Sequence, residues 1–238
     1  MLANRRIDKS PLFRKFNDDG SHDQEYLRVW DPWVITEQNM LGHVSNYTNF
    51  LLARVSNDME VDFSYLGQLV AAMNRHGINL DLFVPPVHVT ELLLFSEGGV
   101  WPLFEKFKVN LLQTTAVLRE RYSANIRLFD FGNISVATTQ TIKPIDEHTT
   151  FDPYFFDPVH FRKPVGDFLL ATMLKCSIER PIPDGFGIEL TRENVMEHLA
   201  SERGKLQAFR LRNPDLVEKI SKTIGSHRKG AFEDQFLQ

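Results

Sequence analysis

The segment DFSYLGQLVAAMNRHGINLDLFVPP, residues 62–86, contains the pattern that decides the fold. The apolar residues of its first part recur at the spacing of one helical face: Phe63, Leu66, Leu69, Val70 and Met73. Gly77 follows as a natural helix stop. The apolar run from Ile78 ends at two prolines, as a buried strand does. These residues therefore predict a helix followed by a strand.

A second unit repeats this order. Residues 101–122 open with a proline in the first turn and predict a long helix. Residues 124–133, ANIRLFDFGN, predict a strand that ends in a Gly-Asn turn. Helix, strand, helix, strand is the order of right-handed crossovers, in which helices cover a parallel sheet. The fold class expected is α/β, with three layers, α/β/α, around a parallel sheet.

The rest of the chain is organised around these units. We expect a polar N-terminal segment over 1–28, the α/β domain over 29–210 and a C-terminal tail over 211–238. The VWDPWVI stretch predicts a weak strand or an extended packing segment, because Pro32 interrupts it. Further helices are expected at 45–57, at 164–174 and from about Thr191, and the residues from Ile224 onward are expected to fray.

Composition limits the classes of function. The 238 residues carry a net charge of −4, with a pI near 6.1, so neither a nucleic-acid surface nor an electrostatic membrane anchor is indicated. No apolar run reaches the length of a membrane span or follows the basic N-terminus as in a signal peptide. The chain as written therefore predicts a cytoplasmic protein if Met1 is its true start. Cys176, the single cysteine, lies among apolar residues and predicts a buried thiol.

The number of strands is too small for a complete sheet. Only two are convincing, at about 78–84 and 126–130, and a two-stranded parallel sheet leaves open edges and uncovered faces. We therefore expect this chain to be incomplete at its N-terminus, with the other strands supplied by a missing upstream segment or by a partner chain that covers the sheet edge.

The stretch YFFDPVHFRKPVGDF, residues 154–168, contains the principal candidate for catalysis. Asp157 precedes His160 by three residues, and Pro158 helps the chain to turn between them. In a hydrolase triad, a histidine accepts the proton of the nucleophile while a carboxylate fixes the ring's tautomer. Because D-x-x-H matches are common by chance, a surface loop with an Asp–His hydrogen bond is the alternative.

Residues 60–200 resemble the C-terminal half of an SGNH/GDSL-type hydrolase, most closely the envelope-associated bacterial members. The resemblance rests on LGQLVAAMNRHGINLDLFVPPVH, on RLFDFGN and on YFFDPVHFRKPVGDFLLATML. It implies an SGNH/flavodoxin-like fold and a serine ester hydrolase or acyltransferase acting on a cell-envelope polymer or another ester. It also implies His160 as general base and Asp157 as its orienting carboxylate, with no cofactor. An upstream anchor, usual in such members, would make the protein membrane-attached or periplasmic.

The nucleophile of that family has no clear counterpart. The family places its serine at the end of the first strand, ahead of the half that this chain resembles. Ser21 follows a glycine but has no apolar strand before it to serve as a rigid mount. Ser96 follows a run that predicts a helix, and Ser135, close to Asn133, sits in the family's late position. The sequence therefore predicts a nucleophile outside these residues.

Three other polar residues near the strand ends each have a possible functional role and a structural alternative. His88 leaves a strand at the edge expected for His160, where it would contact substrate, and the alternative is a cap of the next helix. Asp81 and Asp130 are candidate cleft residues, and a charge satisfied at a strand end is the alternative expected for both. No metal site is expected from His88, His160 and Asp157, whose spacing matches no metal motif. No phosphate-binding glycine loop is present.

Two hypotheses result. In the first, the chain is the C-terminal portion of an SGNH-like acyl-transfer enzyme whose serine lies upstream. In the second, it is a non-catalytic binding or assembly module on a degenerate SGNH scaffold. Ester hydrolysis that depends on His160 separates the two.

Overall fold

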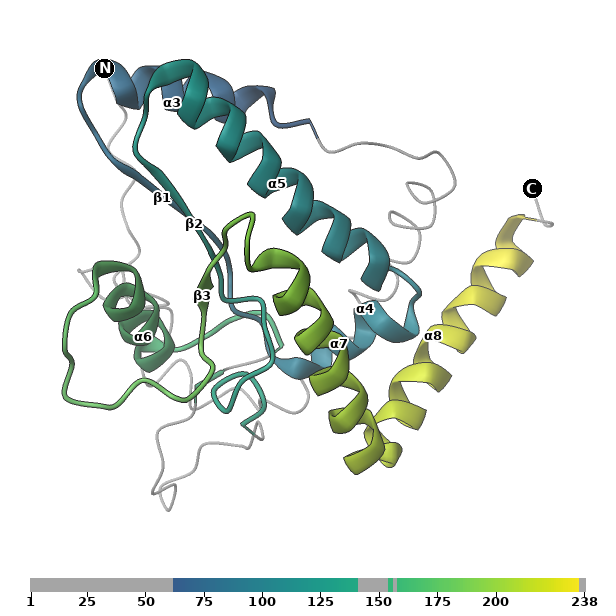
Figure 1. The fold of residues 1–238 in the computed structure, drawn as a ribbon. Helices are drawn as coiled ribbons and strands as arrows, with labels where there is room; N and C mark the ends of the chain where they lie inside the picture. Colours follow the sequence, from purple (N-terminus) through teal and green to yellow (C-terminus); the bar gives the residue numbers. More distant parts are fainter. Residues whose placement is uncertain (1–61, 141–153, 156–157, 236–238) are drawn as a thin grey trace, which may run out of the picture.

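The computed structural model describes residues 62–140, 154–155 and 158–235, and it places six helices and three strands in them (Figure 1). The predicted elements at 29–35 and 45–57, and Asp157, lie outside the described residues. The elements in chain order are α3 (Ser64–Arg75), β1 (Leu80–Val84), α4 (Val89–Glu97), α5 (Trp101–Tyr122), β2 (Ile126–Asp130), α6 (Lys163–Leu174), β3 (Ile188–Glu189), α7 (Val195–Arg212) and α8 (Pro214–Gln235). The predicted mixed α/β class is confirmed.

The three strands form one sheet in the order β1-β2-β3. β1 and β2 are parallel, with register from Leu80 opposite Ile126 to Val84 opposite Asp130. β3, which the sequence did not predict, adds a short antiparallel pairing of Ile188 with Asp130. The sheet is therefore mixed, whereas a parallel one was expected.

Helices cover the two sheet faces unequally. Alternate strand residues, such as Leu82 and Leu128, pack with side chains of α3, α5 and α7 on one face. Phe129, on the opposite face, packs with Phe168 of α6. Figure 1 shows α5 and α7 running along one side of the sheet and α6 on the other. The first face therefore carries most of the helical cover.

Local sequence signals account for several element boundaries. Gly77 has a φ of 65°, the left-handed conformation expected of a glycine after a helix. Pro102 stands in the first turn of α5, as predicted. The helix predicted from about Thr191 is α7, and it begins at Val195, because Thr191 and Asn194 form a turn before it. Thr191 N donates to Asn194 Oδ1 at 2.9 Å, and Asn194 N donates to Thr191 Oγ1 at 3.3 Å.

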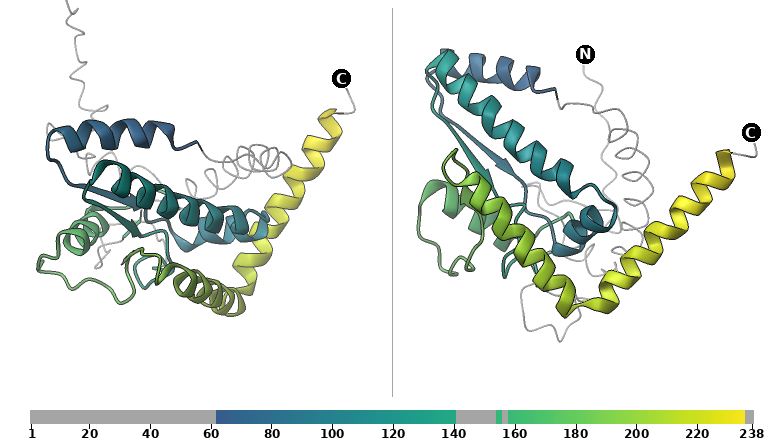
Figure 2. Two further views of the ribbon diagram at one scale, coloured as in Figure 1. Left: turned by 45° about the horizontal axis from the view of Figure 1, so that its top comes forward. Right: turned by 45° about the vertical axis from the view of Figure 1, so that its right-hand side comes forward.

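The C-terminal residues predicted to fray are helical. α8 continues through them to Gln235 and extends away from the rest of the molecule (Figure 2). Ile220 and Ile224 are buried in one cluster with Leu92, Leu93 and Leu94 of α4. This packing holds the part of α8 up to Ile224, because burial of apolar side chains stabilises a helix that its local propensity would not.

Cys176 is exposed, so the predicted burial was wrong. Helix α6 ends at Leu174, and Lys175 adopts the left-handed conformation with a φ of 52°. The chain changes direction there, and residues 174–177, with Cys176 among them, are exposed. Apolar neighbours in the sequence therefore do not predict burial for a residue that follows the end of a helix.

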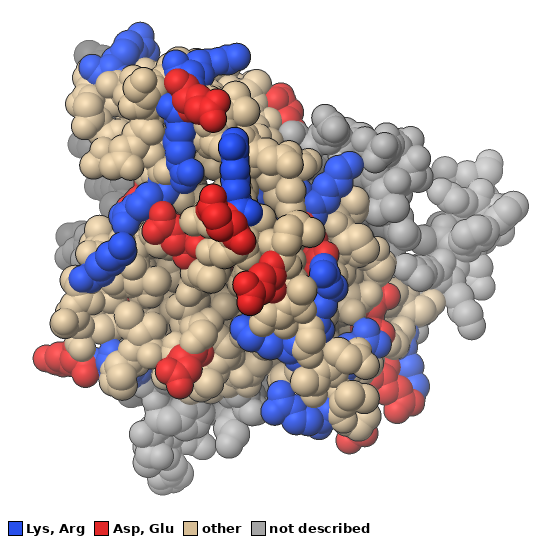
Figure 3. Space-filling view, viewed as in Figure 1, with Lys and Arg blue, Asp and Glu red and all other residues tan. Residues whose placement is uncertain are grey.

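Surface chemistry agrees with the modest net charge. On the face in Figure 3, basic and acidic side chains alternate and form no large patch of one sign. None of the helices in the described part of the chain combines the length and apolar character that a membrane span requires.

Candidate functional site

The candidate site lies at the carboxyl edge of the parallel strands, where three segments meet. Residues 85–88 follow β1, residues 131–140 follow β2, and residues 158–161 precede α6. Val89 N donates to Thr138 O at 2.8 Å, and His88 N donates to Pro158 O at 2.8 Å. These two main-chain hydrogen bonds join the three segments, as expected for an α/β sheet in which loops at the carboxyl ends of the strands build a site.

His88 is the residue that connects the three segments. Its Nδ1 accepts from Thr90 N at 3.2 Å, which caps α4, and its Nε2 lies 2.9 Å from Gln140 O. Since Nδ1 accepts, Nε2 carries the proton and donates it to that carbonyl. The ring also meets Phe155 edge-on, with centroids 5.6 Å apart. Burial lowers the pKa of His88 to about 4, so the ring is neutral near pH 7.

This geometry provides the capping role that the sequence left as the alternative for His88. Both ring nitrogens are engaged within the protein. A substrate could contact the ring nitrogens only by replacing one of those hydrogen bonds. Substrate binding by His88 stays a prediction, and what is shown is a neutral imidazole that fixes the loops of the edge.

His160 is exposed, and two backbone contacts join the residues on either side of it. Phe155 and Phe161 form an antiparallel bridge, and Arg162 N donates to Tyr154 O at 2.8 Å. His160 therefore precedes the bridge residue Phe161, close to the start of α6. Asp157, its predicted partner, lies outside the described residues, so the pairing of the two stays a prediction.

The serines weighed as nucleophiles within the described residues are engaged elsewhere. Ser135 is buried, and its Oγ lies 3.2 Å from Thr138 Oγ1 inside a tight turn. Ser96 lies on α4, where its Oγ accepts from Arg210 Nη1 at 3.0 Å. Among the described residues, neither hydroxyl has a hydrogen bond to a histidine, the contact that activates a nucleophilic serine. Ser21 lies outside the described residues.

A buried charged cluster underlies the edge. Asp130 Oδ2 accepts from Lys108 Nζ at 2.7 Å and lies 2.8 Å from His198 Nε2. Lys108 and Asp130 are almost completely buried, and the lysine ammonium also lies 4.1 Å from the centroid of the Phe104 ring. Burial alone would raise the pKa of Asp130, but the charge of Lys108 and the hydrogen bonds from His198 and Lys108 hold it below its usual value.

This cluster fixes the turn after β2. Lys108 Nζ donates a second hydrogen bond to Gly132 O at 2.9 Å. Two residues on, Ile134 N donates to the buried carboxylate of Glu202, a residue of α7. Asn133 Nδ2 donates to Gly185 O at 2.6 Å, which connects the turn to the loop before β3. Helices α5 and α7 thus hold the turn rigidly, as a scaffold for a preorganised site does.

The prediction of a charge satisfied at a strand end is confirmed for Asp130, the last residue of β2, and Asp81, the second residue of β1, is also paired. Asp81 accepts two hydrogen bonds from Arg127, at 2.7 and 2.6 Å, across the parallel pair. Sequence reasoning missed Lys108 and His198, because they lie 22 and 68 residues from Asp130 with no local pattern. The only signal was the placement of Asp130 at the end of an apolar strand.

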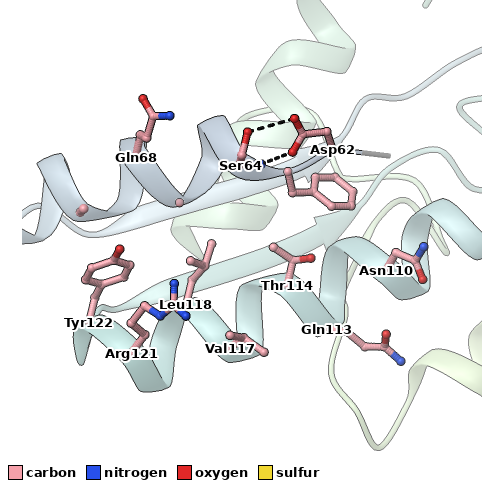
Figure 4. Close-up of a pocket in the computed structure, with 13 residues that line it drawn as sticks. Asp62, Ser64, Gln68, Asn110, Gln113, Thr114, Val117, Leu118, Arg121 and Tyr122 are labelled. Carbon is pink, nitrogen blue, oxygen red and sulfur yellow. Dashed lines mark hydrogen bonds between the residues drawn. The ribbon is translucent and has the colours of Figure 1, made fainter. Parts of the chain in front are cut away.

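A groove of about 980 Å³ lies between α3 and α5 (Figure 4). Its walls carry uncharged polar side chains, among them Gln68, Asn110 and Gln113, and Ser64 donates twice to Asp62 at one end. None of its lining residues belongs to the three segments of the candidate site, so this groove is separate from it. The described residues contain no group of three metal-ligating side chains.

Comparisons with known proteins give no match: no family model, curated protein or solved structure is similar to this chain. The family resemblance therefore stays a prediction.

Proposed function

We propose that this chain is the C-terminal portion of an SGNH-like α/β/α enzyme that transfers acyl groups, as an ester hydrolase or an acyltransferase. The substrate is an acylated cell-envelope polymer or another ester. His160 acts as the general base, Asp157 orients it, and a serine outside residues 1–238 is the nucleophile. The observation that carries the proposal is the hydrogen bond from His88 N to Pro158 O. It holds Pro158 at the carboxyl end of β1, two residues before His160, which is exposed.

The chemistry follows from that placement. The His160 imidazole takes the serine proton as the serine oxygen attacks the ester carbonyl, and the tetrahedral intermediate collapses to an acyl-enzyme. The imidazolium returns its proton to the departing alcohol. Water or a sugar hydroxyl then gives a proton to His160 and attacks the acyl-enzyme, and the imidazolium returns that proton to the serine oxygen as the acyl product leaves.

The two histidines of the edge suit different roles. His88 is buried and neutral, with both nitrogens occupied, so it positions backbone. His160 is exposed, and a general base must reach both solvent and a nucleophile. The turn after β2 is held by its hydrogen bonds to α5 and α7. Such support is what keeps catalytic side chains in position.

Labelling with a fluorophosphonate, which reacts with activated serines, tests the proposal. The protein is isolated from its own cells with an antibody to the C-terminal half. We expect labelling, a decrease of about 100-fold or more in His160→Ala, and a labelled serine peptide outside residues 1–238. His76→Ala changes another exposed histidine and is the matched control. Absent labelling, or labelling that His160→Ala leaves unchanged, would refute the proposal.

The second candidate is a non-catalytic binding or assembly module on the same scaffold. It is favoured by the engagement of Ser135 and Ser96 in hydrogen bonds within the protein. An intact native mass of 27.5 kDa together with absent labelling would support this alternative.

A further inference from the structure

The groove between α3 and α5 is lined by one face of each helix (Figure 4). Ser64, Gln68 and Ala71 of α3 recur at intervals of four and three residues, as positions on one helical face do. The lining residues of α5 recur in the same way from Asn110 to Tyr122, over about 18 Å at 1.5 Å per residue. The groove is therefore long enough for a chain-like ligand.

The two helices carry no charge along most of this groove. Residues 64–74 and 109–118 contain no Asp, Glu, Lys or Arg. The whole chain is 24% charged, so these 21 residues would contain about five charges at its average composition. The charged lining residues, Asp62 and Arg121, lie at opposite ends of the groove (Figure 4). Because the middle of the groove provides no counter-ion, it suits an uncharged ligand.

The floor of the groove is apolar and its rims are polar. Leu118 is buried and Ala71 is half-buried, whereas Gln68 and Gln113 are exposed. In Figure 4, Gln68 and Gln113 extend from the two helices in opposite directions, and Thr114 of α5 points toward α3. A ligand in the groove would therefore meet apolar carbon below it and amide or hydroxyl groups around it.

A sugar unit has the same division of polar and apolar groups. Its hydroxyls radiate from the rim of the ring, and its C–H groups form the two faces. Each hydroxyl both donates and accepts hydrogen bonds, as do the amides of Gln68, Asn110 and Gln113 and the hydroxyl of Thr114. The half-buried ring of Tyr122 also points toward α3, so an aromatic surface with a polar tip lies at one end of the groove.

We propose that the groove between α3 and α5 binds a neutral oligosaccharide. Its walls are helices, whose backbone groups bond within the helix, so an extended peptide has no strand with which to pair. An amphipathic helix requires an apolar groove, and amide-bearing rims do not provide one. The inference goes beyond the acyl-transfer function and does not rest on it, since the groove is separate from the candidate site.

Titration of the full 238-residue chain with three neutral hexasaccharides is the test: cellohexaose, maltohexaose and chitin hexasaccharide. Backbone amide shifts are followed by NMR. We expect at least one probe, at millimolar concentration, to give saturable shifts in Ser64–Ala71 and Asn110–Tyr122 and none in α6. No saturable shift in these two segments with any probe would overturn the proposal. Shifts confined to the segments of His88 and His160 would also overturn it, and would leave the acyl-transfer proposal standing.

Single variants identify the groups that bind the sugar. Gln113→Ala removes a rim amide, and Thr114→Val removes a hydroxyl while keeping the shape of the side chain. We expect each to weaken the affinity for the best probe about fivefold, through the loss of hydrogen bonds. Gln207→Ala changes an exposed glutamine of α7 and is the matched control, which should bind as the wild type does. Unchanged affinity in both groove variants would overturn the assignment.

A charged probe of the same length tests the requirement for a neutral ligand. Hexagalacturonate carries a carboxylate on every unit, and the protein itself has a net charge of −4. We expect it to bind about tenfold more weakly than the best neutral probe, whose affinity should not change when the salt concentration is raised. Tighter binding of hexagalacturonate than of all three neutral probes would overturn the proposal.

Discussion

The buried imidazole of His88 makes the stability of this protein depend on pH in a defined window. In the folded chain the ring stays neutral down to about pH 4, because burial lowers its pKa from 6.5 to about 4. In the unfolded chain it takes up a proton below pH 6.5. The unfolded state therefore binds more protons between these values, and stability falls as the pH falls through the window.

The size of the effect follows from the two pKa values. At 1.36 kcal/mol per pH unit, the interval from 6.5 to about 4 corresponds to about 3 kcal/mol of unfolding free energy. About 2 kcal/mol of it is lost between pH 7 and pH 4.5. The contribution is fully present above pH 6.5. Asp130, whose pKa is lowered, loses its contribution mainly at still lower pH.

The variant His88→Asn isolates this contribution. Asparagine can also cap α4, since its side-chain oxygen accepts from a backbone N–H, but it does not titrate. Urea unfolding of both proteins at pH 7 and at pH 4.5 gives the two free-energy changes. We expect the wild type to lose about 2 kcal/mol more than His88→Asn between these conditions. Equal losses in the two proteins would refute the assignment of a buried neutral imidazole.

Further predictions concern the turn after β2 and the glycines near it. Lys108→Met leaves the Asp130 carboxylate buried without its cation, so urea unfolding at pH 7 should show a loss of about 3–5 kcal/mol, and a loss under 1 kcal/mol would contradict the buried pair. Gly187→Ala should cost at least about 2 kcal/mol, because its φ is 73° and an added Cβ would lie 2.2 Å from Phe131. Gly204→Ala, in the open helix face of α7, is the matched control and should stabilise the protein by about 0.5–1 kcal/mol in the same assay. A destabilised Gly204→Ala, or a neutral Gly187→Ala, would contradict these assignments.

Elements with strong local signals were predicted from the sequence. The apolar spacing of α3, the proline at the start of α5 and the glycine after α3 act within one or two turns. Likewise, the apolar runs at Leu80–Val84 and Ile126–Asp130 predicted the two parallel strands. Each signal depends only on neighbours in the chain, so no partner had to be known.

Features that depend on distant partners were not predicted. β3 is only two residues long, and pairing with β2 defines it. Ile220 and Ile224 of α8 are buried against α4, a contact between segments more than 100 residues apart in the chain. A lysine on a helix is usually a surface residue, so nothing at Lys108 indicated that it is buried.

The features of the candidate site also fall into those that the local sequence predicted and those that only the folded structure revealed. The sequence by itself determined the alternation of helices and strands, the D-x-x-H block and the apolar strands that end at His88 and Asp130, because these are encoded by spacing and residue type. Only the tertiary structure decided that His88 is a neutral cap, that Lys108 and His198 share the Asp130 carboxylate, and that the loop of His160 lies against the end of β1. Burial and hydrogen bonding between residues far apart in the chain set those roles, and both arise only when the sheet and its helices pack.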